Sequence, residues 1–183
     1  MKTIFKCLNL LLFIGSIISS STVYCQEGVN FEKETWSNTL AKAKAENKIV
    51  FVDAYTTWCG PCKKMDAKTF PDEKVGDFFN KNFINIKVDT EKGDGLIIAE
   101  KYKIISYPTL FFVNYDGELV HSSAGARIPE ELIELGEKVI VMVTDPNKSF
   151  LSMEKRYQMG ERGSEFLKNY AYVLFERKMD HQK

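Results

Sequence analysis

The stretch from residue 49 to residue 64 constrains the fold of this chain more than any other. It joins a nearly continuous apolar run, Ile49–Ala54, to a short turn and then to the pattern Cys59-Gly60-Pro61-Cys62. An apolar run of this length is typical of a strand buried on both faces of a sheet. A proline in the first turn is typical of the start of a helix. The sequence therefore predicts a central strand that leads directly into a helix beginning at two cysteines.

The spacing of Cys59 and Cys62 indicates redox chemistry. Residues three apart lie on one face of a helix, so the two sulfurs can join in a short disulfide. Cys59 would face unpaired backbone N–H groups at the helix start, which favour its thiolate. That thiolate can attack a substrate disulfide, and the second thiol can then resolve the mixed disulfide. We predict Cys59 as the attacking thiol and Cys62 as the resolving thiol.

Residues 1–25 have the pattern of a cleaved signal peptide. A positive start with Lys2 and Lys6 precedes an apolar segment from Leu8 to Ile18 and a polar end rich in serine. The apolar segment is short for a membrane span, and a pattern of this kind directs export. We expect cleavage after Cys25 and a periplasmic or secreted protein. An uncleaved anchor and a lipoprotein acylated at Cys25 are the alternatives.

The cysteine count and the charge balance narrow the function further. Cleavage would remove two of the four cysteines and leave Cys59 and Cys62 free for exchange. A structural disulfide and a zinc site are the alternatives for the pair. Zinc prefers four ligands, and only His121 and His181 remain, at no ligand spacing. We expect no metal and no other cofactor. The 25 basic and 25 acidic residues balance, which argues against nucleic-acid binding.

The remaining pattern predicts a mixed sheet with helices on both faces, an α/β fold. The first expected elements are a helix with an apolar stripe from Phe31 to Ala43, the strand at 49–54, and helices at 59–70 and near 75–79. A strand at 83–89, a helix at 96–102, a hairpin of strands 109–113 and 118–122, and a helix from Pro129 complete the series. The strand at 49–54 is expected at the centre of this sheet because it is the most continuously apolar.

Residues 144–183 form an extension after this series of elements. Pro146 breaks the pattern, and two helices are expected after it, at 150–159 and 164–179. The second helix carries one apolar face, made of Phe166, Leu167, Tyr170, Val173 and Leu174. Such a face needs a partner, because about 25 cal/mol is gained for each Å² of apolar surface that is buried. We expect it to pack outside the domain that holds the sheet and the cysteines, to be unnecessary for the chemistry, and to mediate self-association or partner binding through 164–179. We divide the chain into 1–25, 26–143 and 144–183.

The residues around the cysteines resemble the thioredoxin family. Trp58-Cys59-Gly60-Pro61-Cys62-Lys63 matches its active-site motif, and Tyr107-Pro108-Thr109 matches its cis-proline loop. Gly117 and Gly125 match its hairpin and post-strand glycines. The segment from Thr69 to Val75 is more similar to the C-terminal domain of periplasmic thiol:disulfide interchange proteins. The resemblance covers roughly residues 29–142 and implies a thioredoxin-like fold, here followed by a C-terminal helical hairpin.

The resemblance also implies roles for individual residues. Asp53 stands where thioredoxins keep a buried aspartate under the disulfide, and it would exchange a proton with Cys62 through water. Burial should raise the pKa of that carboxyl group. Thioredoxins often place a lysine nearby, but the aligned position is Asn85 and Lys87 lies two residues on, so we expect no cation beside Asp53. The residues expected to bind the substrate are Trp58, Gly60, Pro61, Tyr107 and Pro108, with a cis Tyr107–Pro108 bond facing the disulfide.

These features predict an exported thiol–disulfide oxidoreductase with Cys59, Cys62 and Asp53 as its catalytic residues. The Gly-Pro pair resembles that of reducing thioredoxins, whose reduction potential is about −270 mV. The oxidant DsbA has a potential of about −120 mV. Reduction or isomerisation of protein disulfides is therefore expected, with a membrane thiol:disulfide protein as the electron donor. The alternative is a redox-switched binding module whose C-terminal helices recruit a partner or dimerise.

Overall fold

The computed structural model describes residues 28–145, 147 and 149–180, with their side chains as far as residue 175. The predicted signal peptide and its cleavage site lie outside the described residues. Across the described part of the chain, no helix combines the length and the apolar character needed to cross a bilayer.

Five strands form one mixed sheet in the order β1-β3-β2-β4-β5. The strands are β1 (Phe31–Glu32), β2 (Ile49–Tyr55), β3 (Phe83–Asp89), β4 (Thr109–Val113) and β5 (Leu119–Ala124). β1 and β2 run parallel to β3 on either side of it, and β4 runs antiparallel to both β2 and β5. β2 is the middle strand and its five inner residues are buried, which confirms the prediction from its apolar run.

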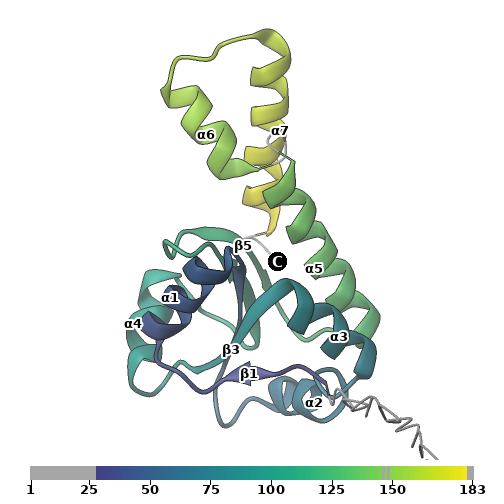
Figure 1. Ribbon diagram of the computed structural model, residues 1–183. Coiled ribbons are helices and arrows are strands. Elements are labelled where there is room, and N and C mark those ends of the chain that lie inside the picture. The colour runs from purple at the N-terminus through teal and green to yellow at the C-terminus, as the bar shows by residue number, and fades with distance from the viewer. Residues whose placement is uncertain (1–27, 146, 148, 181–183) are drawn as a thin grey trace, which may run out of the picture.

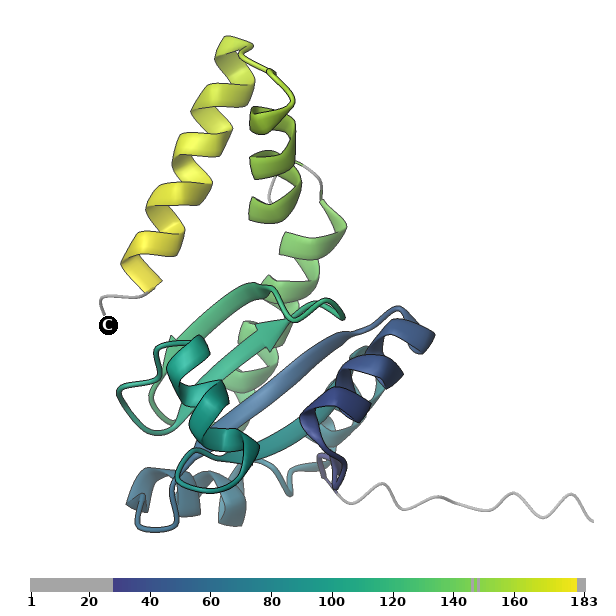
Figure 2. The same ribbon diagram turned by 90° about the vertical axis from the view of Figure 1, so that its left-hand side faces the viewer.

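Helices cover both faces of the sheet (Figures 1 and 2). One face carries α1 (Trp36–Glu46) and α4 (Asp94–Lys101), and the other carries α3 (Glu73–Asn82) and α5 (Pro129–Thr144). The short helix α2 (Gly60–Lys68) follows β2 directly and packs on the same face as α3 through Met65. The predicted α/β fold, a mixed sheet between two helical layers, is confirmed.

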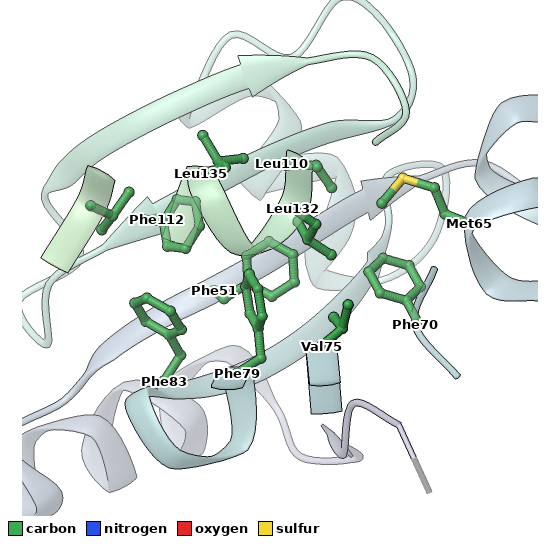
Figure 3. Packing of buried hydrophobic residues seen from close by; sticks show 11 residues of the cluster. Phe51, Met65, Phe70, Val75, Phe79, Phe83, Leu110, Phe112, Leu132 and Leu135 are labelled. Atoms are coloured by element: carbon green, nitrogen blue, oxygen red, sulfur yellow. The ribbon is translucent and has the colours of Figure 1, made fainter. Parts of the chain in front are cut away.

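An aromatic core lies between the sheet and the layer of α3 and α5 (Figure 3). Phe51 of β2 is fully buried, and its ring centroid lies 4.7 Å from that of Phe79 and 5.1 Å from that of Phe112. Met65 of α2 and Leu132 of α5 belong to the same cluster. Burial of large side chains is the main favourable contribution to folding, so this cluster fixes α2 against β2. The two cysteines are thereby held at a defined point of the sheet.

The prediction of a helix that starts near Phe31 is wrong. Phe31 belongs to β1, and α1 begins at Trp36, after Thr35, whose side chain accepts a hydrogen bond from the N–H of Asn38. The Phe31 ring packs edge-on against Phe70 with the centroids 5.0 Å apart, on the side of α3 and α5. Trp36 packs on the opposite face of the sheet. The apolar stripe therefore combines residues of two faces, and helical periodicity alone misassigns its first member.

α6 (Phe150–Gln158) and α7 (Ser164–Asp180) form the predicted C-terminal helical hairpin. Figures 1 and 2 show that it extends beyond the end of α5, away from the sheet, until the last turns of α7 return toward β5. The hairpin has a small apolar cluster of its own. Its buried members are Met153, Phe166 and Tyr170, and Phe150, Tyr157 and Val173 pack around them.

The predicted apolar face of α7 is only partly correct. Phe166, Tyr170 and Val173 face α6, whereas Leu167 and Leu174 are exposed. Residues spaced by four and then three positions share one side of a helix, and α6 occupies only that side. The exposed leucines, together with Phe175, leave apolar surface on the outside of the hairpin.

Candidate active site

Cys59 and Cys62 lie at the start of α2 and form a disulfide bond. Cys59 is the N-cap residue, and its sulfur accepts a hydrogen bond from the backbone N–H of Cys62 at 3.1 Å. Pro61 stands in the first turn, where its missing N–H interrupts no helical hydrogen bond. In the reduced protein, the same N–H and the positive end of the helix would stabilise a thiolate on Cys59.

Both cysteines are buried, with 3% of Cys59 and 1% of Cys62 exposed. The neighbours of Cys59 are exposed instead: Trp58 to 65%, and also Gly60 and Pro61. Cys59 is therefore less exposed than its place at a helix start suggests. A molecule that reaches Cys59 must therefore cross the surface that these neighbours form.

Trp58 and Tyr107 form an aromatic rim next to Cys59. Their rings meet edge to face, with the centroids 5.7 Å apart, and the Trp58 indole N–H donates to a Glu91 carboxylate oxygen at 3.0 Å. The Tyr107–Pro108 peptide bond is cis, and the Pro108 carbonyl accepts a hydrogen bond from the N–H of Gly125 at 2.8 Å. The start of α2, the loop before β4 and the loop after β5 thus come together at the disulfide-bearing end of the sheet.

Asp53 is completely buried within β2. Its Oδ2 accepts a hydrogen bond from Lys87 Nζ at 2.6 Å, and its Oδ1 has no hydrogen-bond partner among the described residues. Burial raises the pKa of the Asp53 carboxyl group, and the opposing charge of Lys87 does not cancel that effect. A carboxylate with a raised pKa is a better proton acceptor than an ordinary aspartate, which is what proton exchange with a thiol requires.

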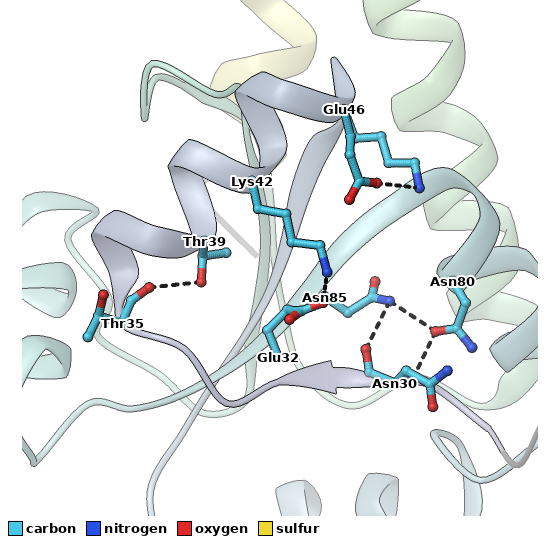
Figure 4. Close-up of polar contacts among 9 residues, drawn as sticks. Asn30, Glu32, Thr35, Thr39, Lys42, Glu46, Asn80 and Asn85 are labelled. Carbon is cyan, nitrogen blue, oxygen red and sulfur yellow. Dashed lines mark hydrogen bonds and ion pairs between the residues drawn. The ribbon is translucent and has the colours of Figure 1, made fainter.

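The expectation that no cation lies beside Asp53 is wrong. β2 and β3 pair with Asp53 opposite Lys87 and with Phe51 opposite Asn85. The Asn85 side chain instead donates to Asn80 Oδ1 of α3 at 3.2 Å, close to Asn30 before β1 (Figure 4). The parallel register of β2 and β3 places Lys87, and not Asn85, beside Asp53. The alignment with thioredoxins, which put Asn85 at the position of their lysine, is therefore two residues out of register.

Lys87 also bonds to Asp66, on α2. Burial alone would lower the pKa of Lys87, but the ion pairs with Asp53 and Asp66 raise it. At Lys87 the ion pairs decide the pKa, because two carboxylates share the ammonium group and part of the side chain reaches water. At the fully buried Asp53 the loss of hydration decides the pKa instead. Lys87 therefore stays cationic, and Asp53 is the member of the pair that titrates.

The residues predicted from the sequence fall into two places. Around the disulfide lie Trp58, Gly60, Pro61, Tyr107 and Pro108, and within the sheet lies Asp53. In the described part of the chain, no three His, Cys, Asp or Glu side chains are grouped so as to hold a metal ion.

The sequence did not predict that Lys87 pairs with Asp53 or that Glu91 accepts from Trp58. Strand register could have found Lys87, whereas Glu91 follows the end of β3 in a loop and carries no sequence signal of its own.

Comparison with known proteins places these features among related chains. The family model described as "Protein of unknown function, DUF255", and named Thioredox_DsbH, matches residues 20–102. A thioredoxin of Staphylococcus epidermidis is 38% identical over 96 residues, which cover 52% of this chain and 86% of that thioredoxin. The thiol:disulfide interchange protein DsbD of Pseudoalteromonas atlantica is 31% identical over 91 residues, which cover 49% of this chain and only 15% of DsbD.

A solved structure has the same fold at higher identity. The solution structure of a candidate disulphide-isomerase from Bacteroides thetaiotaomicron is 40% identical and superposes with a TM-score of 0.57. The match covers 62% of this chain and 94% of that structure. That extent accommodates the sheet and its covering helices, and it leaves more than a third of this chain unmatched.

Proposed function

Because this chain belongs to the thioredoxin family of thiol–disulfide oxidoreductases, we propose that it is an exported enzyme that reduces or isomerises protein disulfides. The observation that carries the proposal is the position of the cysteine pair. Cys59 caps α2 and accepts the N–H of Cys62, so the helix start that makes a thiolate favourable also holds the second sulfur within bonding distance.

In the proposed reaction, the Cys59 thiolate attacks one sulfur of a protein disulfide and displaces the other as a thiolate, which takes a proton from water. A mixed disulfide between Cys59 and the substrate results. Cys62 then gives its proton to Asp53 through water and attacks the Cys59 sulfur, so the Cys59–Cys62 bond forms as the bond to the substrate breaks. Two electrons pass from the dithiol to the substrate, whose second sulfur leaves as a thiolate and takes a proton from water or from Asp53. The enzyme is left with its disulfide.

We further propose that the exposed surface around Cys59 binds the substrate. The support is the exposure of Trp58, the edge-to-face contact that holds Tyr107 against it, and the surface position of Gly60 and Pro61. An extended substrate segment could pair with the backbone of Tyr107 beside Pro108, as an added strand. Backbone pairing of this kind tolerates many substrate sequences.

Insulin reduction tests the proposal. Protein comprising residues 26–183, recycled by a small dithiol, should accelerate the precipitation of insulin chains well above the rate of the dithiol alone. A rate equal to that background would contradict the enzymatic function and favour the alternative, a redox-switched binding module. Heat-treated protein at the same concentration controls for nonspecific effects on precipitation.

Export is a part of the proposal that rests on the sequence of residues 1–25 and on the likeness to part of DsbD, whose name describes thiol:disulfide interchange. A reducing enzyme outside the cytoplasm needs electrons from across the membrane, and we propose a membrane thiol:disulfide protein as their source. The expected result is a mass that lacks residues 1–25 when the full chain is expressed and its periplasmic or secreted fraction is measured. A full-length mass confined to the membrane fraction would rule out cleavage.

The hairpin of α6 and α7 is proposed to serve contacts with other chains rather than chemistry. It has its own apolar cluster, and Leu167, Leu174 and Phe175 expose apolar surface on its outside. A chain that ends at Asp145 should therefore reduce insulin at a rate within about twofold of the longer protein, because α2, the cis-proline loop and the core helices are all retained. It should also lose any self-association that light scattering detects for residues 26–183. An unfolded or inactive truncated chain would show that the boundary near residue 144 is misplaced.

A further inference from the structure

Lys87 lies between two carboxylates of very different exposure. Its ammonium group donates to Asp53 at 2.6 Å and also to Asp66. The exposed fraction of the side chain is 0% for Asp53, 23% for Lys87 and 46% for Asp66. The three charges therefore form a continuous hydrogen-bonded series from the interior of the sheet to the solvent.

Three aromatic rings hold Lys87 in this place. Its Nζ lies 5.2 Å from the ring centroid of Phe31, 5.0 Å from that of Tyr55 and 4.7 Å from that of Phe70. Each distance is within the range of a cation–π contact, and a partly buried ammonium group gains most from such contacts. The rings also restrict the rotamers that the long side chain can adopt. Lys87 is therefore a fixed bridge between the carboxylates.

Asp66 connects this series to the cysteines. It stands four residues after Cys62 on α2, and residues four apart lie on the same face of a helix. Lys87 reaches that face from β3, where it is opposite Asp53 in the parallel register. The proton acceptor proposed for Cys62 and the helix that carries Cys62 are thus joined through one ammonium group.

We propose that Asp66 is a positioning residue for the thiol exchange, which holds Lys87 between the two carboxylates and keeps Asp53 ready to take up and release a proton. The proposal rests on the function proposed above. The charged groups that act on Asp53 are Lys87 from β3, which favours its ionised form, and Asp66 from α2, which opposes it. By sharing Lys87 and by its own negative charge, Asp66 weakens the stabilisation of the Asp53 carboxylate. The proton that Cys62 transfers to Asp53 in the resolving step is returned through this polar series to water or to the leaving substrate thiolate.

The test is the titration of Asp53 itself, followed by carbon-13 NMR of protein labelled in its aspartate carboxyl groups. In Asp66→Asn, one opposing negative charge is gone and Lys87 pairs with Asp53 alone, so the midpoint of the Asp53 titration should move to lower pH. Asp66→Glu restores the charge and should return the midpoint toward that of the unmodified protein. Asp77→Asn, which removes an exposed carboxylate from α3, should leave it unchanged. A midpoint that stays in place or rises in Asp66→Asn would overturn the proposal.

The same variants separate this proposal from the proposed function. The acid limb of the pH profile for insulin reduction should move to lower pH in Asp66→Asn and return in Asp66→Glu. An active Asp66→Asn protein with an unmoved acid limb and an unmoved Asp53 midpoint would overturn the role of Asp66 and leave the reductase function standing. An unmodified protein that fails to reduce insulin would overturn the reductase function, and with it any role of Asp66 in the exchange.

Discussion

Replacing Cys59 with serine should reduce the rate of insulin reduction by at least about a thousandfold, because the nucleophile of a covalent mechanism is then missing. The fold should survive, since serine is close to cysteine in size and can still cap α2. A circular dichroism spectrum and melting temperature close to those of the reduced protein would establish this. The expected loss is therefore one of chemistry and not of structure.

Replacing Cys62 with serine should instead stop the reaction after its first step. Cys59 remains at the helix start, but no second thiol attacks the mixed disulfide. Nonreducing electrophoresis and mass spectrometry should show Cys62→Ser joined to a substrate chain, and Cys59→Ser joined to none. The assignment would be reversed if Cys59→Ser were the variant that accumulates the adduct, or if iodoacetamide at neutral pH labelled Cys62 before Cys59.

Replacing Asp53 with asparagine should slow the resolution of the mixed disulfide by about a hundredfold, at the lower end of what a positioned proton acceptor contributes. Asp53 is fully buried, its Oδ1 has no hydrogen-bond partner among the described residues, and its pKa is raised. These are the properties expected of the proton acceptor that we propose for Cys62. Quenched-flow sampling of the mixed disulfide isolates this step from the first attack. A resolution rate within a factor of about two of the unmodified protein would exclude Asp53 from the step.

The same substitution makes a prediction about stability whose sign follows from the pKa. The pKa of the Asp53 carboxyl group is higher in the folded protein than its unfolded value of 3.8. Below pH 3.8 the group contributes its full stabilisation of the fold, and this contribution is lost as the pH rises through the folded-state pKa. Asparagine does not titrate, so Asp53→Asn should gain stability relative to the unmodified protein as the pH rises through this window. Each unit by which the pKa is raised corresponds to about 1.4 kcal/mol. Urea unfolding below and above the window measures the difference, with Asp77→Asn as the surface control; a constant difference would contradict the raised pKa.

The features that could be predicted from the sequence are those that local physics decides. The continuous apolar run of β2 and the proline after Cys59 specify a buried strand and a helix start within a few residues, and both are observed. The position of Asp53 in that run was also enough to predict its burial and the direction of its pKa.

The features that could not be predicted depend on contacts between distant segments. Lys87 meets Asp53 because of the parallel register of β2 and β3, which no local pattern reveals. Phe31 joins the core from a separate short strand, so its apolar character was assigned to the wrong element. On α7, Phe166 and Tyr170 are buried and Leu167 is exposed because α6 packs on only one side of the helix. The periodicity of α7 alone does not show on which side α6 lies.

The reduction potential of the Cys59–Cys62 pair tests the central claim, that this protein donates electrons to protein disulfides. The protein is equilibrated with glutathione buffers of graded ratio, and the reduced fraction is measured after acid quenching and alkylation. The Gly60-Pro61 pair between the cysteines predicts a potential near that of reducing thioredoxins, about −270 mV. A potential near that of the oxidant DsbA, about −120 mV, would contradict the claim, because such a pair would withdraw electrons from protein thiols instead of supplying them.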